Sequence, residues 1–161
     1  MRNLALLAAA TSLIALSPPA ASQVTPMTPD VVASYDPVMP FADFVRREAM
    51  VPMRDGTKLY TVIVMKKGTT GAPILLSRTP YDAHGSTHRN ASQRIVDVLG
   101  IMDAEFAEDG YIRVYQDIRG LHRSEGQFVM NRPLAGPLNK TGIDESTDAY
   151  DTIDWLVKNV P

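Results

Sequence analysis

The amino-acid sequence predicts an α/β fold that opens with an antiparallel hairpin and continues with strands alternating with helices. Residues 49–65 contain two strand-like segments around an Asp-Gly turn. Residues 73–79 and 111–116 have the pattern of strands that are buried on both faces of a sheet. One helical pattern separates these two strands and a second follows them, which is the order of strand–helix units in an α/β domain.

The hairpin comes first. Ala49–Met53 is expected to be a short strand, and Leu59–Met65 alternates and is rich in β-forming residues, so we expect it to be the return strand. Arg54–Thr57 lies between them, and its Asp-Gly pair favours a type I′ turn. Lys66–Ala72 contains two glycines and is expected to be a loop.

Two buried strands with a helix between them follow. Pro73–Thr79 and Tyr111–Gln116 are the strands, and the polar segment Tyr81–Arg89 is expected to be a loop. The helix is expected to end at Gly110. Its pattern rests on Ile101, Ala104, Phe106 and Ala107.

The last element is a helix that starts at Asp144, after a long polar loop over Asp117–Gly142. Its apolar face is expected to consist of Ala149, Ile153, Leu156, Val157 and Val160. A further strand is expected where the sequence ends, at Pro161. We therefore expect residues 41–161 to be the N-terminal part of a larger domain.

The first 40 residues have a different character. Arg2, the apolar stretch Leu4–Leu16 and the small residues Ala20–Ser22 have the layout of a secretory signal peptide, which we place at residues 1–22. The apolar stretch is shorter than the roughly 20 residues that span a bilayer. Residues 23–40 contain four prolines and are expected to form an extended arm. We expect export to the periplasm or the medium, and no membrane anchor after cleavage; the alternative is that the apolar stretch stays uncleaved as an anchor.

Composition excludes several classes of function. The formal net charge is −2 without a basic run, which argues against a nucleic-acid partner. The chain contains no cysteine, so disulfides, thiolate nucleophiles and cysteine-based metal centres are excluded.

Several separate motifs occur in an order that resembles one branch of the α/β-hydrolases. They are Ser77–Asp82, Gly110–Gly120 continued by Ser124–Gly126, Asn131–Pro133, Asp144–Asp148 and Ile153–Leu156. The branch holds the α-amino acid ester hydrolases, cocaine esterase and the X-Pro dipeptidyl-peptidase-like acyl hydrolases, and the α-amino acid ester hydrolases look most similar. The fold that this resemblance implies is the N-terminal part of an α/β-hydrolase.

The resemblance implies hydrolysis of esters or amides by a Ser-His-Asp triad, without cofactor or metal. In such enzymes the serine lies in a Gly-x-Ser-x-Gly elbow between a strand and a helix. This chain lacks that elbow, which by resemblance would follow Pro161, so we expect the chain alone to be inactive. By the same resemblance Tyr81 donates its hydroxyl to the oxyanion. The alternative is a tyrosine that only packs over its loop.

Ser124 needs separate consideration, because His122–Gly126 is a Gly-x-Ser-x-Gly motif with its first glycine replaced. The serine lies in a loop well beyond its strand, and His122 is too close in sequence for the usual triad geometry. We therefore interpret Ser124 as a structural residue, with a nucleophilic role as the alternative. Arg123 stands where the resembled sequences carry glycine, which leaves the conformation of this loop open.

Charged residues near the strand ends are interpreted mainly as structural. Asp117 and Arg119 are expected to form a pair that fixes the loop after their strand, with help from acids of the last helix such as Asp148 or Asp151, and direct contact with substrate is the alternative. His84 and His88 are four residues apart but lie in an expected loop, so we expect no metal site there. We also expect no metal at the acids of the last helix, which are Asp144, Glu145, Asp148, Asp151 and Asp154.

The most specific hypothesis is an exported serine hydrolase acting on small α-amino acid esters or β-lactam-type amides, of which this chain is the N-terminal portion. Two alternatives stay open. One is an X-Pro peptidase or another carboxylesterase of the same family, and the other is a non-catalytic exported binding or scaffold domain. For the full-length protein we expect a small-molecule substrate, and we leave a homo-oligomeric assembly open.

Overall fold

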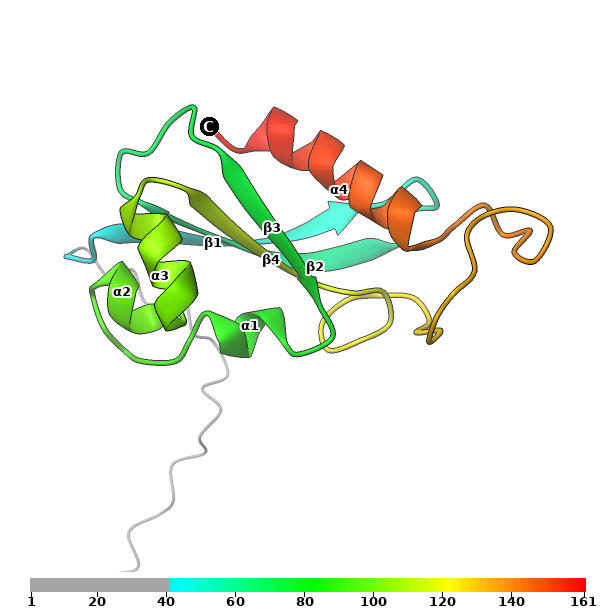
Figure 1. Cartoon of the computed structure of the whole chain (residues 1–161), viewed down its shortest axis with the longest axis horizontal. Coiled ribbons are helices and arrows are strands. Elements are labelled where there is room, and N and C mark those ends of the chain that lie inside the picture. Colours follow the sequence, from blue (N-terminus) through cyan, green and yellow to red (C-terminus); the bar gives the residue numbers. More distant parts are fainter. Residues whose placement is uncertain (1–40) are drawn as a thin grey trace, which may run out of the picture. The chain divides into compact units, whose positions relative to one another are not determined.

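The computed structural model describes residues 41–161, which form a four-stranded sheet with helices on both faces (Figure 1). The predicted signal peptide and proline-rich arm lie outside the described residues. The strands are β1 (Phe44–Pro52), β2 (Lys58–Lys66), β3 (Ile74–Thr79) and β4 (Ile112–Asp117). The helices are α1 (Ala83–Ser86), α2 (Ile95–Val98), α3 (Ile101–Glu108) and α4 (Glu145–Asn159).

The sheet has the strand order β1-β2-β4-β3, with antiparallel pairing except between β3 and β4, which are parallel. This mixed arrangement confirms the predicted fold class. The hairpin turn differs in detail from the expectation. Gly56 has a φ of 84° but Asp55 does not have a positive φ, whereas a type I′ turn needs both. The Gly56 amide instead donates to the Met53 carbonyl, and the wider loop closes between Met53 and Thr57.

Successive side chains of β2 point to opposite faces of the sheet and contribute to a separate part of the core on each face. Tyr60, Val62 and Val64 face a cluster that includes α1, α2 and α3, whereas Ile63 and Met65 face the side on which Leu156 of α4 packs. All six residues of β4 are buried. The central strands β2 and β4 are therefore enclosed on both sides, which confirms the prediction for β4. The same prediction fails for β3, which lies at the edge of the described sheet and has all six residues only partly buried, because β4 pairs with it on one side alone.

Several elements differ from the sequence-based expectation. β1 begins at Phe44, five residues earlier than predicted. The expected loop over residues 81–89 contains the single-turn helix α1, and the unpredicted helix α2 precedes α3. In α3 the small residues Ala104 and Ala107 are buried, while Ile101 remains 84% exposed. None of the helices in residues 41–161 is long and apolar enough to cross a membrane.

The helix α4 begins as predicted, because Asp144 caps it. The Asp144 carboxylate accepts a hydrogen bond from the Thr147 amide at 2.7 Å, and the Thr147 hydroxyl accepts one from the Asp144 amide at 2.8 Å. This reciprocal capping box satisfies amide donors that the helix itself leaves free.

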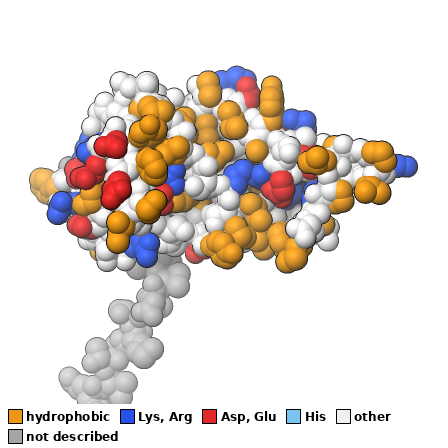
Figure 2. Space-filling model, viewed as in Figure 1, with side chains coloured by type: hydrophobic (Ala, Val, Ile, Leu, Met, Phe, Trp, Pro, Cys, Tyr) orange, Lys and Arg blue, Asp and Glu red, His pale blue; other side chains and the backbone are white. Residues whose placement is uncertain are grey.

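The face that α4 presents to the sheet is not the predicted apolar one. Its buried residues are Asp148, Thr152 and Leu156, whereas Ile153 and Val157 are largely exposed. Polar partners explain the difference, since the Thr152 hydroxyl donates to Gln116 Oε1 at 3.0 Å and Asp148 binds Arg119. Apolar side chains consequently lie among charged ones on the molecular surface (Figure 2).

A buried ion pair connects the loop after β4 to α4. Arg119 Nη2 lies 2.6 Å from Asp148 Oδ1 and Arg119 Nε lies 2.9 Å from Asp148 Oδ2, with both residues almost fully buried. Arg119 Nη1 also donates to Asp55 of the hairpin turn at 2.8 Å. The Asp148 and Asp55 carboxylates raise the pKa of Arg119 above its usual range, so the guanidinium stays charged.

The expected pairing of Asp117 with Arg119 is wrong. The Arg119 side chain is directed at Asp55 and Asp148, while the Asp117 carboxylate accepts hydrogen bonds from main-chain amides. Of the two helix acids suggested as partners, Asp148 binds Arg119 and Asp151 binds Arg54. The bidentate geometry of Arg119 and Asp148 is the physical reason, because it satisfies a buried guanidinium better than a single contact with Asp117 would.

A cluster of titratable groups attaches α1 to β1 and β2. His84 Nδ1 lies 3.1 Å from the Tyr60 hydroxyl, 3.3 Å from Arg46 Nη2 and 3.3 Å from Glu48 Oε1. The His88 ring stacks on the His84 ring with a centroid separation of 4.1 Å. Burial lowers the pKa of both histidines, and Arg123 and Arg46 lower that of His84 further.

The Arg119–Asp148 pair predicts unequal effects of two Asp-to-Asn substitutions on α4. Asp148→Asn breaks a buried pair and should lower the free energy of unfolding by about 3 kcal/mol. The control Asp154→Asn breaks only the exposed pair with Lys158 and should change it by about 0.5 kcal/mol or less. Chemical denaturation of both variants measures the difference, and equal effects would contradict the assigned role of Asp148.

The histidine cluster predicts a pH dependence of stability. Because the pKa values of His84 and His88 are lower in the folded chain than the ordinary value of 6.5, the unfolded chain binds more protons near that pH. The free energy of unfolding should therefore be fully retained above about pH 7 and fall as the pH drops through 6.5. The double variant His84→Gln/His88→Gln should show a flatter profile in denaturation between pH 7.5 and 5.5, and an unchanged profile would refute this assignment.

Candidate active site

The carboxyl ends of β3 and β4 meet at one edge of the sheet. These strands pair in parallel, with Ile74 opposite Ile112 and Thr79 opposite Asp117. The segment that follows β3 carries Tyr81, and the segment that follows β4 carries Ser124. Parallel register thus brings together two motifs that are about 40 residues apart in the sequence, and ligand sites in α/β sheets commonly form at this edge.

Tyr81 presents its phenol to the outside. Within residues 41–161 the residue is 82% exposed. Its main-chain amide donates to the Thr79 hydroxyl at 3.0 Å. Within residues 41–161 the Tyr81 hydroxyl has no hydrogen-bond partner.

Asp117, the last residue of β4, is fully buried beside this segment. Its Oδ1 accepts a hydrogen bond from the Ala83 amide at 2.7 Å, and its Oδ2 accepts one from the Arg123 amide at 3.3 Å. One carboxylate therefore contacts both loops at the carboxyl edge of the sheet.

The main chain between Tyr81 and α1 adopts an unusual conformation. Asp82 has a φ of 63° and a ψ of 94°, which is rare for a residue other than glycine. Its carboxylate caps α1 by accepting from the His84 amide at 3.1 Å. A Cβ atom at Gly85 would lie 2.8 Å from Asp82 Oδ2, so glycine provides the space for this cap.

Ser124 is held in a structural arrangement. Its hydroxyl donates to the Asp117 carbonyl at 2.6 Å and accepts from the Tyr60 amide at 2.9 Å. His122 lies elsewhere, with its Nε2 2.8 Å from the Pro80 carbonyl oxygen. The structure does not bring this serine and histidine together as a nucleophile and its base, which require a mutual hydrogen bond.

The acids and histidines considered as metal ligands have other partners. Asp144 caps α4, and Glu145, Asp148, Asp151 and Asp154 pair with Arg78, Arg119, Arg54 and Lys158 respectively. His84 contacts Tyr60, Arg46 and Glu48. Among residues 41–161 no group of three or more acidic or histidine side chains is arranged to hold a metal ion.

Sequence reasoning assigned no role to Arg78 or to the His122 contact. Arg78 Nε donates to Gln116 Oε1 at 3.0 Å, and its Nη1 donates to the Glu145 carbonyl at 2.7 Å. The position of Arg78 in the Ser77–Asp82 motif was visible in the sequence, but its partners lie 38 and 67 residues away. No sequence signal pointed to the contact between His122 and Pro80.

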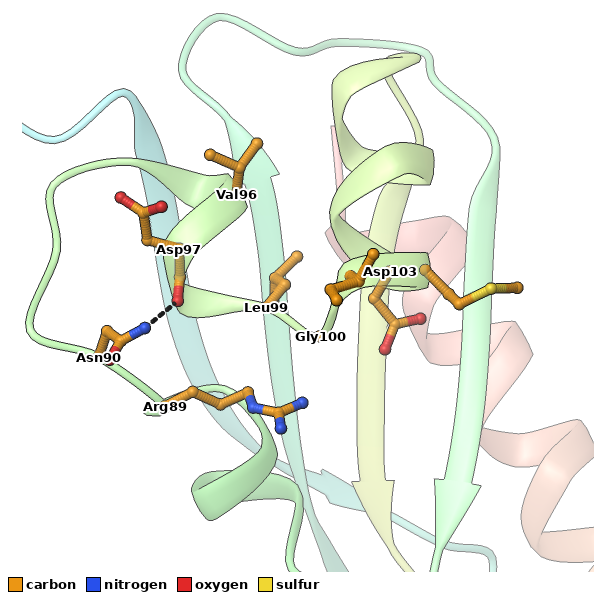
Figure 3. A pocket seen from close by; sticks show the side chains of 9 residues that line it. Arg89, Asn90, Val96, Asp97, Leu99, Gly100 and Asp103 are labelled. Carbon is orange, nitrogen blue, oxygen red and sulfur yellow. Dashed lines mark hydrogen bonds between the residues drawn. The ribbon is translucent and has the colours of Figure 1, made fainter.

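An open pocket of about 610 Å³ lies apart from Tyr81, near α2 and the start of α3 (Figure 3). Asn90 Nδ2 donates there to the Asp97 carbonyl at 2.8 Å, and Arg89 extends beneath Gly100. Its lining contains no serine, histidine or tyrosine. This pocket therefore offers neither a nucleophile nor a general base of the kind that serine hydrolysis needs.

Comparison with known proteins gives a consistent assignment. Cocaine esterase from Rhodococcus sp. (strain MB1 Bresler) is 35% identical over 114 residues, which are 71% of this chain and 17% of that protein. A solved α-amino acid ester hydrolase is 56% identical with a TM-score of 0.75, covering 84% of this chain and 22% of the other. An aminopeptidase from a marine sediment Thaumarchaeota archaeon is 51% identical with a TM-score of 0.75, covering 82% and 22%.

The chain thus spans about a fifth of the length of these relatives. The two similar structures support the α/β-hydrolase-like fold, and the named relatives are ester hydrolases and a peptidase. The model of the X-Pro dipeptidyl-peptidase (S15) family matches residues 55–161, which include both loops at the carboxyl edge of the sheet. The chain belongs to this family of ester hydrolases and peptidases.

Proposed function

We propose that this chain contributes Tyr81 as an oxyanion donor to a serine hydrolase that cleaves or transfers the acyl groups of α-amino acid esters or β-lactam-type amides. The observation that carries the proposal is the exposed Tyr81 phenol at the carboxyl end of β3, whose hydroxyl has no partner in residues 41–161. Family membership supports the reaction class.

The chemistry follows from where charge develops. When a serine attacks an ester or amide carbonyl, the carbonyl oxygen becomes an anion in the tetrahedral intermediate. A neutral phenol held at a strand end can donate a hydrogen bond to that oxygen without reorganising at the moment of reaction. One such donor contributes about 3 kcal/mol to stabilisation of the transition state. In the proposed enzyme the second donor is a main-chain amide beside the nucleophile.

The substrate class rests on similarity. The 56% identity to a solved α-amino acid ester hydrolase favours an ester or amide of an α-amino acid over the substrate of the less similar cocaine esterase. Two alternatives have support of their own. The family match favours an X-Pro peptidase, and the occupied Ser124 hydroxyl suits a non-catalytic binding or scaffold domain.

We propose that the 161-residue chain alone does not hydrolyse esters. The Ser124 hydroxyl already has two main-chain partners, and His84 and His122 are engaged with other groups. The proposed substrates are small molecules, and the weak negative charge supports neither nucleic acid nor an anionic membrane as a partner.

Tyr81→Phe tests the oxyanion role. The substitution can be made in a hybrid hydrolase in which residues 41–161 replace the matching segment of the α-amino acid ester hydrolase. Removing one donor should lower kcat about 100-fold or more with little change in KM, measured on an α-amino acid ester. Tyr150→Phe, which alters an exposed tyrosine of α4, is the matched control and should have no effect.

Two results would refute the proposal for Tyr81 or for the isolated chain. Unchanged kcat in Tyr81→Phe would remove the oxyanion role. Stoichiometric labelling of the 161-residue chain by a fluorophosphonate probe, lost in Ser124→Ala, would show that Ser124 is a nucleophile after all.

We also propose that residues 1–22 direct export, on the basis of the charge, apolar stretch and small residues described above. Expression of the chain in a bacterial host should yield a processed protein that begins at Gln23 or Ser22. Mass spectrometry of the intact protein measures this, and recovery of an uncleaved chain starting at Met1 would contradict export by this route.

A further inference from the structure

The position of the Tyr81 phenol depends on the main chain around it. Because the residue is 82% exposed, few side-chain contacts hold the ring itself. The main chain next to it passes through Asp82, whose positive φ is unfavourable for a residue with a Cβ atom. Such a conformation persists only where surrounding contacts determine it.

Those contacts come from the segment that follows β4. On the buried side, Asp117 Oδ1 accepts a hydrogen bond from the Ala83 amide at 2.7 Å, which fixes the main chain two residues beyond Tyr81. From the exposed side, His122 Nε2 binds the Pro80 carbonyl at 2.8 Å, which fixes the residue before it. The Tyr81 amide itself is held by the Thr79 hydroxyl.

Asp117 is well placed to fix the conformation of both loops. It is the last residue of β4, a strand buried along its whole length, so its carboxylate starts from a rigid element. A buried carboxylate requires donors, and the donors it finds are the main-chain amides of Ala83 and Arg123. Movement of either loop would leave one oxygen of the buried carboxylate without its donor, so the carboxylate restricts both loops.

We infer that Asp117 is a positioning residue, which acts through the Ala83 amide to place the Tyr81 hydroxyl where an oxyanion develops. The inference rests on the proposed oxyanion role of Tyr81. It gives Asp117 a part in the reaction without contact to substrate, in addition to its part in the fold.

The test is a double-mutant cycle in the hybrid hydrolase. Asp117→Ala should lower kcat about 10- to 100-fold with little effect on KM, the loss that misplacement by about an ångström produces. Asp117→Asn should be milder, because its Oδ1 can still accept from the Ala83 amide. In Tyr81→Phe/Asp117→Ala the second substitution should add no further loss of kcat, since Asp117 then has no hydroxyl to place.

The outcomes separate the two ideas. Suppose that Tyr81→Phe lowers kcat. If Asp117→Ala alone leaves kcat unchanged, or if it lowers kcat as much in the Tyr81→Phe background as in the wild type, the positioning role is wrong while the oxyanion role stands. If Tyr81→Phe leaves kcat unchanged, the oxyanion role itself fails. Asp151→Asn, a partly buried acid of α4 that pairs with Arg54, is the matched control and should retain full activity.

A second measurement uses the full 161-residue chain and needs no activity. In Asp117→Asn and Asp117→Ala, hydrogen exchange of the Ala83 amide should accelerate at least about tenfold relative to wild type, because its acceptor is weakened or lost. The Tyr111 amide, which donates to the Phe106 carbonyl away from this site, is the reference and should accelerate less than the Ala83 amide. Equal acceleration at both amides would show that Asp117 only stabilises the fold.

Discussion

The hydrogen bonds of the Asp117 carboxylate are the interaction on which the arrangement of the two loops at the carboxyl edge of the sheet depends. It is fully buried at the end of β4, and the amides that satisfy it belong to the two loops that leave the parallel strands. Burial makes an unsatisfied carboxylate costly, so the conformations of the two loops are coupled. The parallel register that sets Thr79 opposite Asp117 makes this coupling geometrically available.

A second polar group of contacts determines how α4 lies on the sheet. Arg119 reaches Asp148 of the helix and Asp55 of the hairpin turn, and Gln116 accepts from Thr152. Because these partners lie on one face of α4, that face turns inward and carries Leu156 with it. Breaking a buried pair of this kind is costly, even where the intact pair adds little net stability, which keeps the orientation specific.

The sequence was sufficient for elements whose signals are local. The hairpin strands, the places of β3 and β4 in the chain, the helix at 101–108 and the start of α4 at its Asp144 cap all follow from neighbouring residues, whereas the edge position of β3 does not. The buried face of α4 and the partners of Asp117 were mispredicted, because each depends on residues far away in the sequence. For Arg119 the sequence suggested Asp148 correctly but missed Asp55 of the hairpin turn. In the candidate site, Tyr81 came from a motif resemblance, whereas the contact of His122 with Pro80 required the three-dimensional structure.

We propose that the carboxyl edge formed by β3 and β4 presents the Tyr81 hydroxyl to a developing oxyanion. A crystal structure of the hybrid hydrolase inactivated by an aminoalkyl phosphonate tests it most directly, because the phosphonyl oxygen occupies the place of that anion. We predict a separation of about 2.7–3.1 Å between the Tyr81 hydroxyl and this oxygen, with the Ala83 amide still bound to Asp117. A phenol turned away, with another side chain donating to the oxygen, would contradict the account.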